Sequence, residues 1–150
     1  MTKLFRIGQI VPSSNTTMET EVPALLRARE AAAPERFTFH SSRMRMHRVT
    51  PEELAKMNSE GVRCAAELAD ARVDVMSTAC LVAIMASGPG YHRQVERELA
   101  DAAEAAGGMG AVMTSAGALI DGLQALGARR ISLMAPYMEP LTQKVIDYVA

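Results

Sequence analysis

Short apolar runs alternate along this chain with longer segments in which apolar residues recur every three or four positions. The runs cover residues 5–11, 37–41, 73–77, 111–113 and 130–135. The segments between them have the period of helices with one buried face. Strands that alternate with helices of ten to twenty residues predict βαβ units and a parallel sheet. We therefore expect an α/β fold, a Rossmann-like parallel sheet with flanking helices.

Two of the expected helices have marked starts. Thr50 and Glu53 have the spacing of a capping box, and Pro51 occupies the first helical position between them. A later helix is expected to begin near residue 115, capped by Ser115 or Thr114. These signals predict helix starts at both places.

Composition and charge exclude several classes of partner. Sixteen basic and 17 acidic residues give a net charge of −1, so no overall field attracts nucleic acid or an anionic membrane. The longest apolar run, residues 79–86, is far shorter than the roughly 20 residues that a membrane-spanning helix needs. The first 14 residues lack the apolar core of a signal peptide. We expect a cytoplasmic protein with no nucleic-acid or membrane partner.

The cysteines, histidines and methionines have mostly structural interpretations. Two cysteines and three histidines form neither a disulfide framework nor a zinc-binding pattern, so no metal is expected. Cys64 lies on the apolar stripe of a predicted helix and is expected to pack in the core. His92 follows a glycine-rich turn and is expected on an exposed turn. The 11 methionines are expected to fill the core rather than to line a cleft.

Polar residues cluster where three of the predicted strands end, at residues 13–17, 77–80 and 136–137. Ligands of open parallel sheets bind beyond the carboxyl ends of the strands. Hydroxyl, amide and helix N-terminal N–H groups can bind a carboxylate there without a basic cluster. Cys80 would lie at a helix N-terminus, where the dipole lowers the pKa of a thiol. The pattern predicts a thiol site for a small carboxylic acid, although Cys80 could instead be a packing residue and residues 13–17 only a capped loop.

Four segments of the chain resemble a known family. They are residues 12–21 (PSSNTTMETE), 79–83 (ACLVA) with 90–92 (GYH) downstream, 126–131 (LGARRI) and 135–137 (APY). The chain is thereby similar to the maleate cis–trans isomerases of the aspartate/glutamate racemase superfamily, which also contains arylmalonate decarboxylases. The first segment is specific to the isomerases, whereas the last is shared across the superfamily.

The resemblance implies a two-lobed, pseudo-symmetric racemase-type fold with one cysteine from each lobe facing a cleft. Residues 1–114 would form the first α/β lobe, and residues 115–150 the crossover helix and the start of a second lobe. The second cysteine of the family lies beyond the point at which this chain stops, so we expect a truncated chain that is inactive alone. The family uses no metal or organic cofactor, and a homo-oligomer, a dimer, is expected.

The resemblance also assigns roles to individual residues. Cys80 would add as a thiolate to the double bond of maleate, which gives a covalent succinyl adduct that rotates and eliminates fumarate. Asn15, with Ser14 or Thr16, would bind one carboxylate of this small dicarboxylate. Tyr137 would contact the other carboxylate or the enolate-like intermediate. The remaining substrate-binding residues that it implies are Leu81 and Val82.

Three other functions stay open. An amino-acid racemase on the same fold would use cleft cysteines for proton transfer, and so would an arylmalonate-type decarboxylase. The run at residues 13–17 argues against both, and the presence of Cys80 argues against the decarboxylase. The chain could also be a non-catalytic carboxylate-binding domain.

Overall fold

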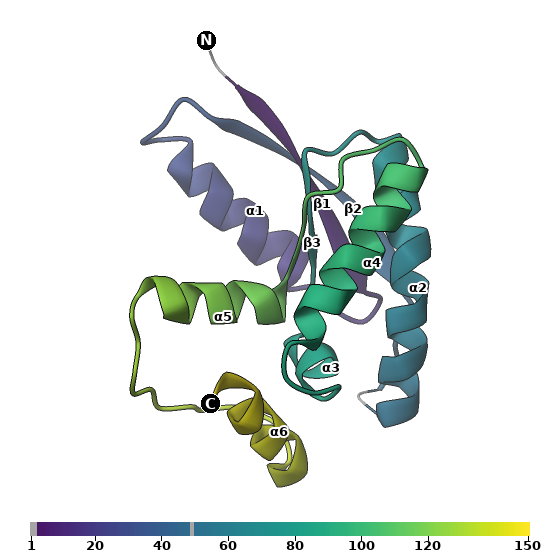
Figure 1. Ribbon diagram of the computed structural model, residues 1–150. Helices are drawn as coiled ribbons and strands as arrows, with labels where there is room; N and C mark the ends of the chain where they lie inside the picture. Colours follow the sequence, from purple (N-terminus) through teal and green to yellow (C-terminus); the bar gives the residue numbers. More distant parts are fainter. Residues whose placement is uncertain (1–2, 49) are drawn as a thin grey trace.

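The computed structural model describes residues 3–48 and 50–150, which form a parallel sheet with helices packed around it (Figure 1). The elements follow in the order β1 (Leu4–Pro12), α1 (Met18–Arg29), β2 (Arg36–Met44), α2 (Pro51–Asp70), β3 (Val75–Thr78), α3 (Leu81–Met85), α4 (Tyr91–Ala105), β4 (Val112–Thr114), α5 (Ser115–Ala125) and α6 (Glu139–Val149). The predicted α/β fold is confirmed.

The sheet has four strands in the order β2-β1-β3-β4, and every neighbouring pair is parallel. Ile7 of β1 is in register with Phe39 of β2 on one side and with Val75 of β3 on the other. The chain therefore moves outward from β1 in one direction and then in the opposite direction. Such a reversal leaves a crevice at the carboxyl ends of the two central strands, β1 and β3.

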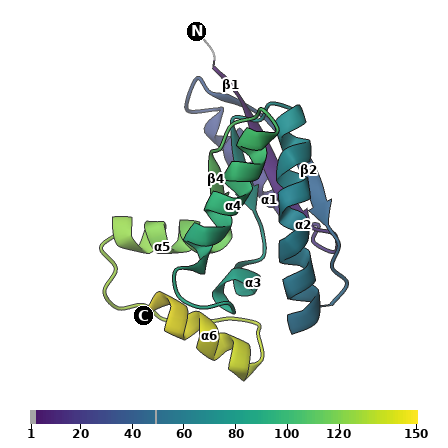
Figure 2. The ribbon, with the colours of Figure 1, turned by 45° about the vertical axis from the view of Figure 1, so that its right-hand side comes forward.

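Helices cover both faces of this sheet. α2 and α4 lie side by side on one face, and α1 lies on the other (Figures 1 and 2). On the α2 face, a Cβ atom at Gly8 would lie only 3.0 Å from the Val73 side chain and 3.3 Å from that of Leu68. On the α1 face, the buried Gln9 amide donates to the main-chain oxygen of Met18 at the start of α1. Both helices are thus placed by contacts with β1.

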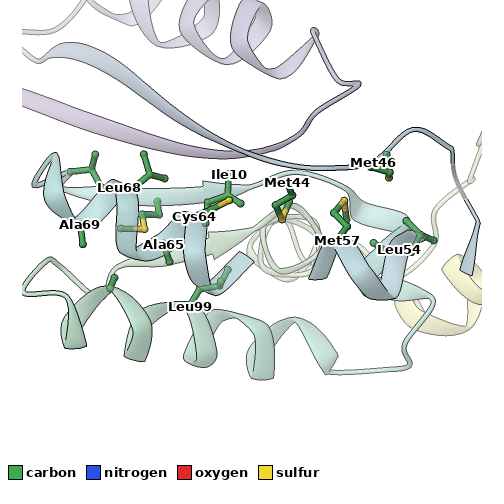
Figure 3. Close-up of a cluster of buried hydrophobic side chains, with 14 residues drawn as sticks. Ile10, Met44, Met46, Leu54, Met57, Cys64, Ala65, Leu68, Ala69 and Leu99 are labelled. Carbon is green, nitrogen blue, oxygen red and sulfur yellow. The ribbon is translucent and has the colours of Figure 1, made fainter. Parts of the chain in front are cut away.

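The main core lies between the sheet and the α2–α4 pair (Figure 3). Its fully buried side chains include Ile10 and Met76 from the sheet, Cys64 from α2 and Leu99 from α4. Cys64 is 0% exposed, so its predicted packing role is confirmed. Burial raises the pKa of the Cys64 thiol, which keeps it protonated and inert.

The two marked helix starts are also confirmed. The Thr50 hydroxyl accepts from the Glu53 backbone N–H at 3.3 Å, and the Thr114 hydroxyl accepts from the Gly117 N–H at 2.9 Å. The Glu53 carboxylate does not complete the capping box, because it accepts instead from the backbone N–H groups of His47 and Arg48. These bonds lower the pKa of Glu53.

The predicted fifth strand is wrong. Residues 130–135 form no strand, and Ile131 and Met134 are 48% and 99% exposed. The order of the described sheet ends at β4, so no described strand lies beside this segment to pair with its backbone groups. An apolar β pattern becomes a strand only where a partner strand exists.

The prediction for His92 is also wrong. His92 is 6% exposed and lies in the first turn of α4, which begins at Tyr91. Its ring packs against Tyr148 of α6 at a centroid distance of 5.7 Å. A partner 56 residues away along the chain buries this histidine, and no local sequence pattern announces such a contact.

α3, α5 and α6 gather at the carboxyl end of the sheet (Figures 1 and 2). Their apolar residues form a second cluster, in which Val82, Ala116, Val145 and Tyr148 are buried. Cys80 packs against this cluster and also against the main core. No helix in the described residues has the length and apolar character needed to cross a bilayer.

Candidate active site

A cavity of about 580 Å³ opens at the carboxyl ends of the strands. It lies beyond the chain reversal at β1 and β3, where parallel sheets bind their ligands. Its lining residues are Pro12, Asn15, Met18, Val22, Met46, Ser77, Thr78, Ala79, Cys80, Leu81, Val82, Met113, Thr114, Ser115, Ala118 and Tyr137. Asn15 of the first polar cluster in the sequence, residues 77–80 of the second and Tyr137 of the third therefore meet in one cavity.

Cys80 occupies a constrained turn between β3 and α3. Its backbone has φ +83° and ψ +68°, a left-handed conformation that non-glycine residues seldom adopt. The Ala79 backbone N–H, one residue earlier, donates to the oxygen of Ile10 at 3.0 Å, which ties the turn to β1. The carboxyl end of the sheet thus holds the thiol in the cavity wall with a strained backbone, as found at many functional sites.

The expected lowering of the Cys80 pKa is not found. Burial raises the pKa of this thiol, and the backbone N–H of Ala83 offsets the rise only partly. α3 has five residues, little more than one turn, and desolvation outweighs what so short a helix offers a thiolate. The Cys80 side chain is therefore a neutral thiol at neutral pH.

Asn15 has its side-chain oxygen committed to the fold. Oδ1 accepts from the backbone N–H groups of Thr17 and Met18 at 2.9 and 3.0 Å, which caps the start of α1. The amide is thereby oriented, and its Nδ2 group remains a hydrogen-bond donor. Arg43 donates to the main-chain oxygen of Asn15 at 3.3 Å and pairs with Glu19. Arg43 is a positioning residue that the sequence analysis missed, because nothing local links β2 to this loop.

Tyr137 reaches the cavity from the segment before α6. The Thr142 hydroxyl donates to the main-chain oxygen of Tyr137 at 3.1 Å, so the first turn of α6 holds this residue. Burial raises the pKa of the Tyr137 phenol, and the neighbouring charge of a Cys80 thiolate would raise it further. The phenol therefore stays protonated and can act as a hydrogen-bond donor in the cavity that Cys80 also lines.

The other predicted site residues divide into two groups. Leu81 and Val82 line the cavity directly after Cys80, at the start of α3. Ser14 and Thr16 are exposed and do not line it. The neighbouring Ser13 has a structural role instead, since its hydroxyl accepts from the Met46 N–H at 3.0 Å.

Several lining residues were not assigned to the site from the sequence. Thr114 and Ser115 enter from the start of α5, and the end of a short predicted strand followed by a helix cap was a signal for them. Met18, Met46 and Met113 also line the cavity. The expectation that the methionines fill the core rather than line a cleft is thus wrong for these three. It is right for four others, which are buried: Met44, Met57, Met76 and Met85.

The described side chains that line the cavity carry no charge. They offer a thiol, a phenol, an amide and hydroxyl groups within mainly apolar walls. No group of three or more potential metal-ligating side chains occurs in residues 3–48 and 50–150. An anionic ligand would be held there by neutral donors, whose hydrogen bonds to a charged acceptor are stronger than those to a neutral one.

Comparisons with known proteins relate the chain to arylmalonate decarboxylases and maleate isomerases. The family model described as arylmalonate decarboxylase matches residues 7–150. Maleate isomerase from Pseudomonas putida is 62% identical over 149 residues, which are 99% of this chain and 60% of that protein. This chain spans about three fifths of the length of the curated relatives that it matches.

Solved structures extend the comparison to three dimensions. The crystal structure of maleate isomerase Iso from Pseudomonas putida S16 matches with a TM-score of 0.95 at 62% identity, over 98% of this chain and 59% of that one. A cysteine-to-serine mutant of Nocardia farcinica maleate cis–trans isomerase matches with a TM-score of 0.89 at 51% identity, over 97% of this chain and 58% of that one. That mutant carries a covalently bound succinylcysteine intermediate.

Proposed function

We propose that this chain, which belongs to the arylmalonate decarboxylase family, supplies the nucleophile of a site that isomerises maleate to fumarate. The observation that carries the proposal is the strained thiol of Cys80 in a cavity shared with Asn15 and Tyr137. Support comes from relatives that are 62% identical and named maleate isomerase. The succinylcysteine found in another relative is the adduct that such a thiol would form.

The proposed reaction adds and then removes the thiol across the double bond. The Cys80 sulfur bonds to one alkene carbon of maleate, and the π electrons move onto the other alkene carbon and its carboxylate. Transfer of the thiol proton to that carbon completes a succinyl thioether. The former double bond is now single and rotates. Loss of the same proton then expels the thiolate and gives fumarate, with no net change in protons or electrons and no chemical need for a cofactor.

Three residues have distinct roles in this scheme. Cys80 is the nucleophile, and its raised pKa means that the proton must leave during the addition step. Asn15 Nδ2 would donate to one substrate carboxylate, while Oδ1 keeps its bonds to α1. The protonated Tyr137 would donate to the enolate-like carboxylate that forms as sulfur adds. Neutral donors held in a dry site stabilise such charge effectively.

Leu81 and Val82 would complete substrate binding at the start of α3, where their backbone lines the cavity. A substrate-binding role for Ser14 and Thr16 has less support, because both are exposed and lie outside the cavity lining. Their role would be limited to shaping the loop that carries Asn15.

We also propose that residues 1–114 form a first lobe and residues 115–150 begin a second. The exposed apolar side chains of Ile131, Leu133 and Met134 would then be covered by a second lobe, which would also bring the opposing acid–base cysteine that the resemblance implies. An intact mass well above that of 150 residues for the protein expressed from its gene would support this division.

Two further expectations remain proposals, a cytoplasmic location and a homodimer. Cys64 and Cys80 are both free thiols, which suits a reducing compartment. Light scattering on the purified protein would test the dimer, and fractionation of the source cells would test the location.

The test of the proposed function is incubation of the protein, as its gene encodes it, with maleate and no added cofactor. Formation of fumarate, together with a mass increase on the peptide that carries Cys80 equal to one maleic acid, supports the mechanism. Absence of fumarate, with no adduct at Cys80, rejects it. Ser59→Ala is a suitable control variant, because Ser59 is exposed on α2 and lies outside the cavity lining.

Arylmalonate decarboxylation is the second candidate, since it gives the matching family model its description. An assay with phenylmalonate separates the two reactions. Release of carbon dioxide without conversion of maleate would favour the decarboxylase. Conversion of aspartate to its enantiomer would instead favour a racemase. Protection of Cys80 from alkylation by maleate, without any turnover, would favour a carboxylate-binding domain.

A further inference from the structure

A buried hydrogen-bonded pair joins α4 to α6 away from the cavity lining. The Tyr148 hydroxyl lies 3.0 Å from the backbone nitrogen of His92 and 2.5 Å from His92 Nδ1. Both residues are more than nine-tenths buried. The hydroxyl accepts from the backbone N–H and shares a second hydrogen bond with the ring nitrogen Nδ1. The proposed reaction uses neither side chain.

The Tyr148 hydroxyl takes the role of a capping side chain at the start of α4. Gly90 is the N-cap residue of α4 and has no side chain to offer, so the first-turn N–H of His92 needs a partner from elsewhere. Tyr148, 56 residues further along the chain, supplies that partner. Without the hydroxyl, a buried N–H and a buried ring nitrogen would both lose their hydrogen bond, which is costly.

The pair also fixes the position of α6. Two contacts besides that of Tyr148 hold α6. Val145 is buried in the cluster shared with α3, and Lys144 Nζ donates to the Ala86 oxygen at 3.1 Å. At its other end, the first turn of α6 holds Tyr137 through Thr142. α3, against which α6 packs, begins immediately after Cys80. The helix α6 thus connects the buried pair to Tyr137, which lines the cavity together with Cys80. Figure 2 shows α6 beside α3 and near the start of α4.

We propose that His92 and Tyr148 are positioning residues, which hold α6 so that the Tyr137 hydroxyl meets the intermediate formed at Cys80. This inference rests on the proposed function for its catalytic consequence. Displacements of about 1 Å at a reacting group can change a rate by about 100-fold. A shift of α6 should therefore lower kcat more than it raises KM.

The experiment is a double-mutant cycle in the protein as its gene encodes it. Tyr148→Phe should lower kcat about tenfold, whereas the matched change Tyr91→Phe, on a tyrosine in the same cluster, should leave kcat within about twofold. In a Tyr137→Phe background, Tyr148→Phe should lower kcat little further, because its effect passes through the Tyr137 hydroxyl. Equal losses in both backgrounds, or no loss in either, would overturn the positioning role.

A second readout is independent of turnover. α6 packs over the cluster that holds Cys80, so Tyr148→Phe should speed alkylation of Cys80 by iodoacetamide at least about threefold, and Tyr91→Phe should not. If the unaltered protein makes no fumarate, the proposed function fails and this rate decides the placement of α6. Unchanged alkylation would then reject the pair as a determinant of the Cys80 environment. Thermal melting of each variant verifies that it is folded at the assay temperature.

Discussion

The surroundings of the two cysteines show two ways in which this fold uses a thiol. Cys64 lies in the main core between α2 and the sheet, is fully buried, and has ordinary helical backbone geometry within α2 (Figure 3). Cys80 lies at the edge of the same core, but on a left-handed turn in the wall of a cavity. Burial raises the pKa of both thiols. What separates them is access and backbone strain, and both of these are set at the carboxyl end of the sheet.

The largest expected effect is on catalysis. Cys80→Ala should lower kcat/KM for maleate by about 1,000-fold or more, because it removes the only proposed nucleophile. Cys64→Ala should leave kcat/KM within about twofold. Steady-state production of fumarate measures both. Equal losses in the two variants would erase the distinction between a core thiol and a cavity thiol.

The next effect concerns a residue that serves both fold and cavity. Asn15→Asp keeps an oxygen for the N–H groups of Thr17 and Met18, but it replaces the Nδ2 donor with a negative charge. We expect kcat/KM to fall about 100-fold, mainly through KM, because the new carboxylate repels the substrate.

The control for this change is the melting temperature. Asn15→Asp should melt at nearly the temperature of the unaltered protein, while Asn15→Ala should melt lower because the start of α1 loses its cap. An Asn15→Asp variant with unchanged KM would show that Nδ2 does not bind the substrate.

A smaller effect, on stability, should depend on packing at Cys64 and on backbone strain at Cys80. Cys64→Ala leaves a space in the packed core and should lower the free energy of unfolding by about 1–2 kcal/mol. Cys80→Gly relieves the positive φ of that turn and should make the protein about 1 kcal/mol more stable than Cys80→Ala. Urea denaturation measures all three variants. A Cys80→Gly protein no more stable than Cys80→Ala would mean that the turn stores no strain.

The smallest effect is on the pH dependence of alkylation, measured in the Cys64→Ala variant so that Cys80 alone reports. Burial raises the pKa of Cys80, so its thiolate fraction should still be increasing above about pH 8.5, the ordinary value for a thiol. Between pH 8.5 and 9.5 the rate with iodoacetamide should therefore rise by a larger factor in the folded protein than in the unfolded one. The same thiol in the urea-unfolded protein should gain less than about twofold. A profile that is level by pH 8.5 in the folded protein would contradict the raised pKa.

Much of the site could be anticipated because it is built from strand ends. The alternation of apolar runs and helical segments predicted a parallel sheet, and its topology brought Asn15 and Cys80 to one cavity. Tyr137 reaches the same cavity from the segment before α6, not from a strand end. The helix caps at Thr50 and Thr114 were equally visible. Each of these features depends on residues within a few positions of one another, or on rules that hold for every parallel sheet.

The failures share a different property. Residues 130–135 have the composition of a strand but lack a described neighbour to pair with, and the α4 start at Tyr91 placed His92 inside a helix. Arg43 reaches the Asn15 loop from β2. Each depends on contacts between residues that are distant in the chain.

Local sequence was therefore enough to specify the fold class, the helix caps and the edge of the sheet at which chemistry would occur, because periodicity and turn preferences act between near neighbours. Long-range packing settled the protonation of the Cys80 thiol and the burial of His92. A pKa responds to all the apolar groups that exclude water around a thiol, and here those groups come both from the cluster of α3, α5 and α6 and from the main core. Their combined effect on Cys80 appears only once the chain has folded around it.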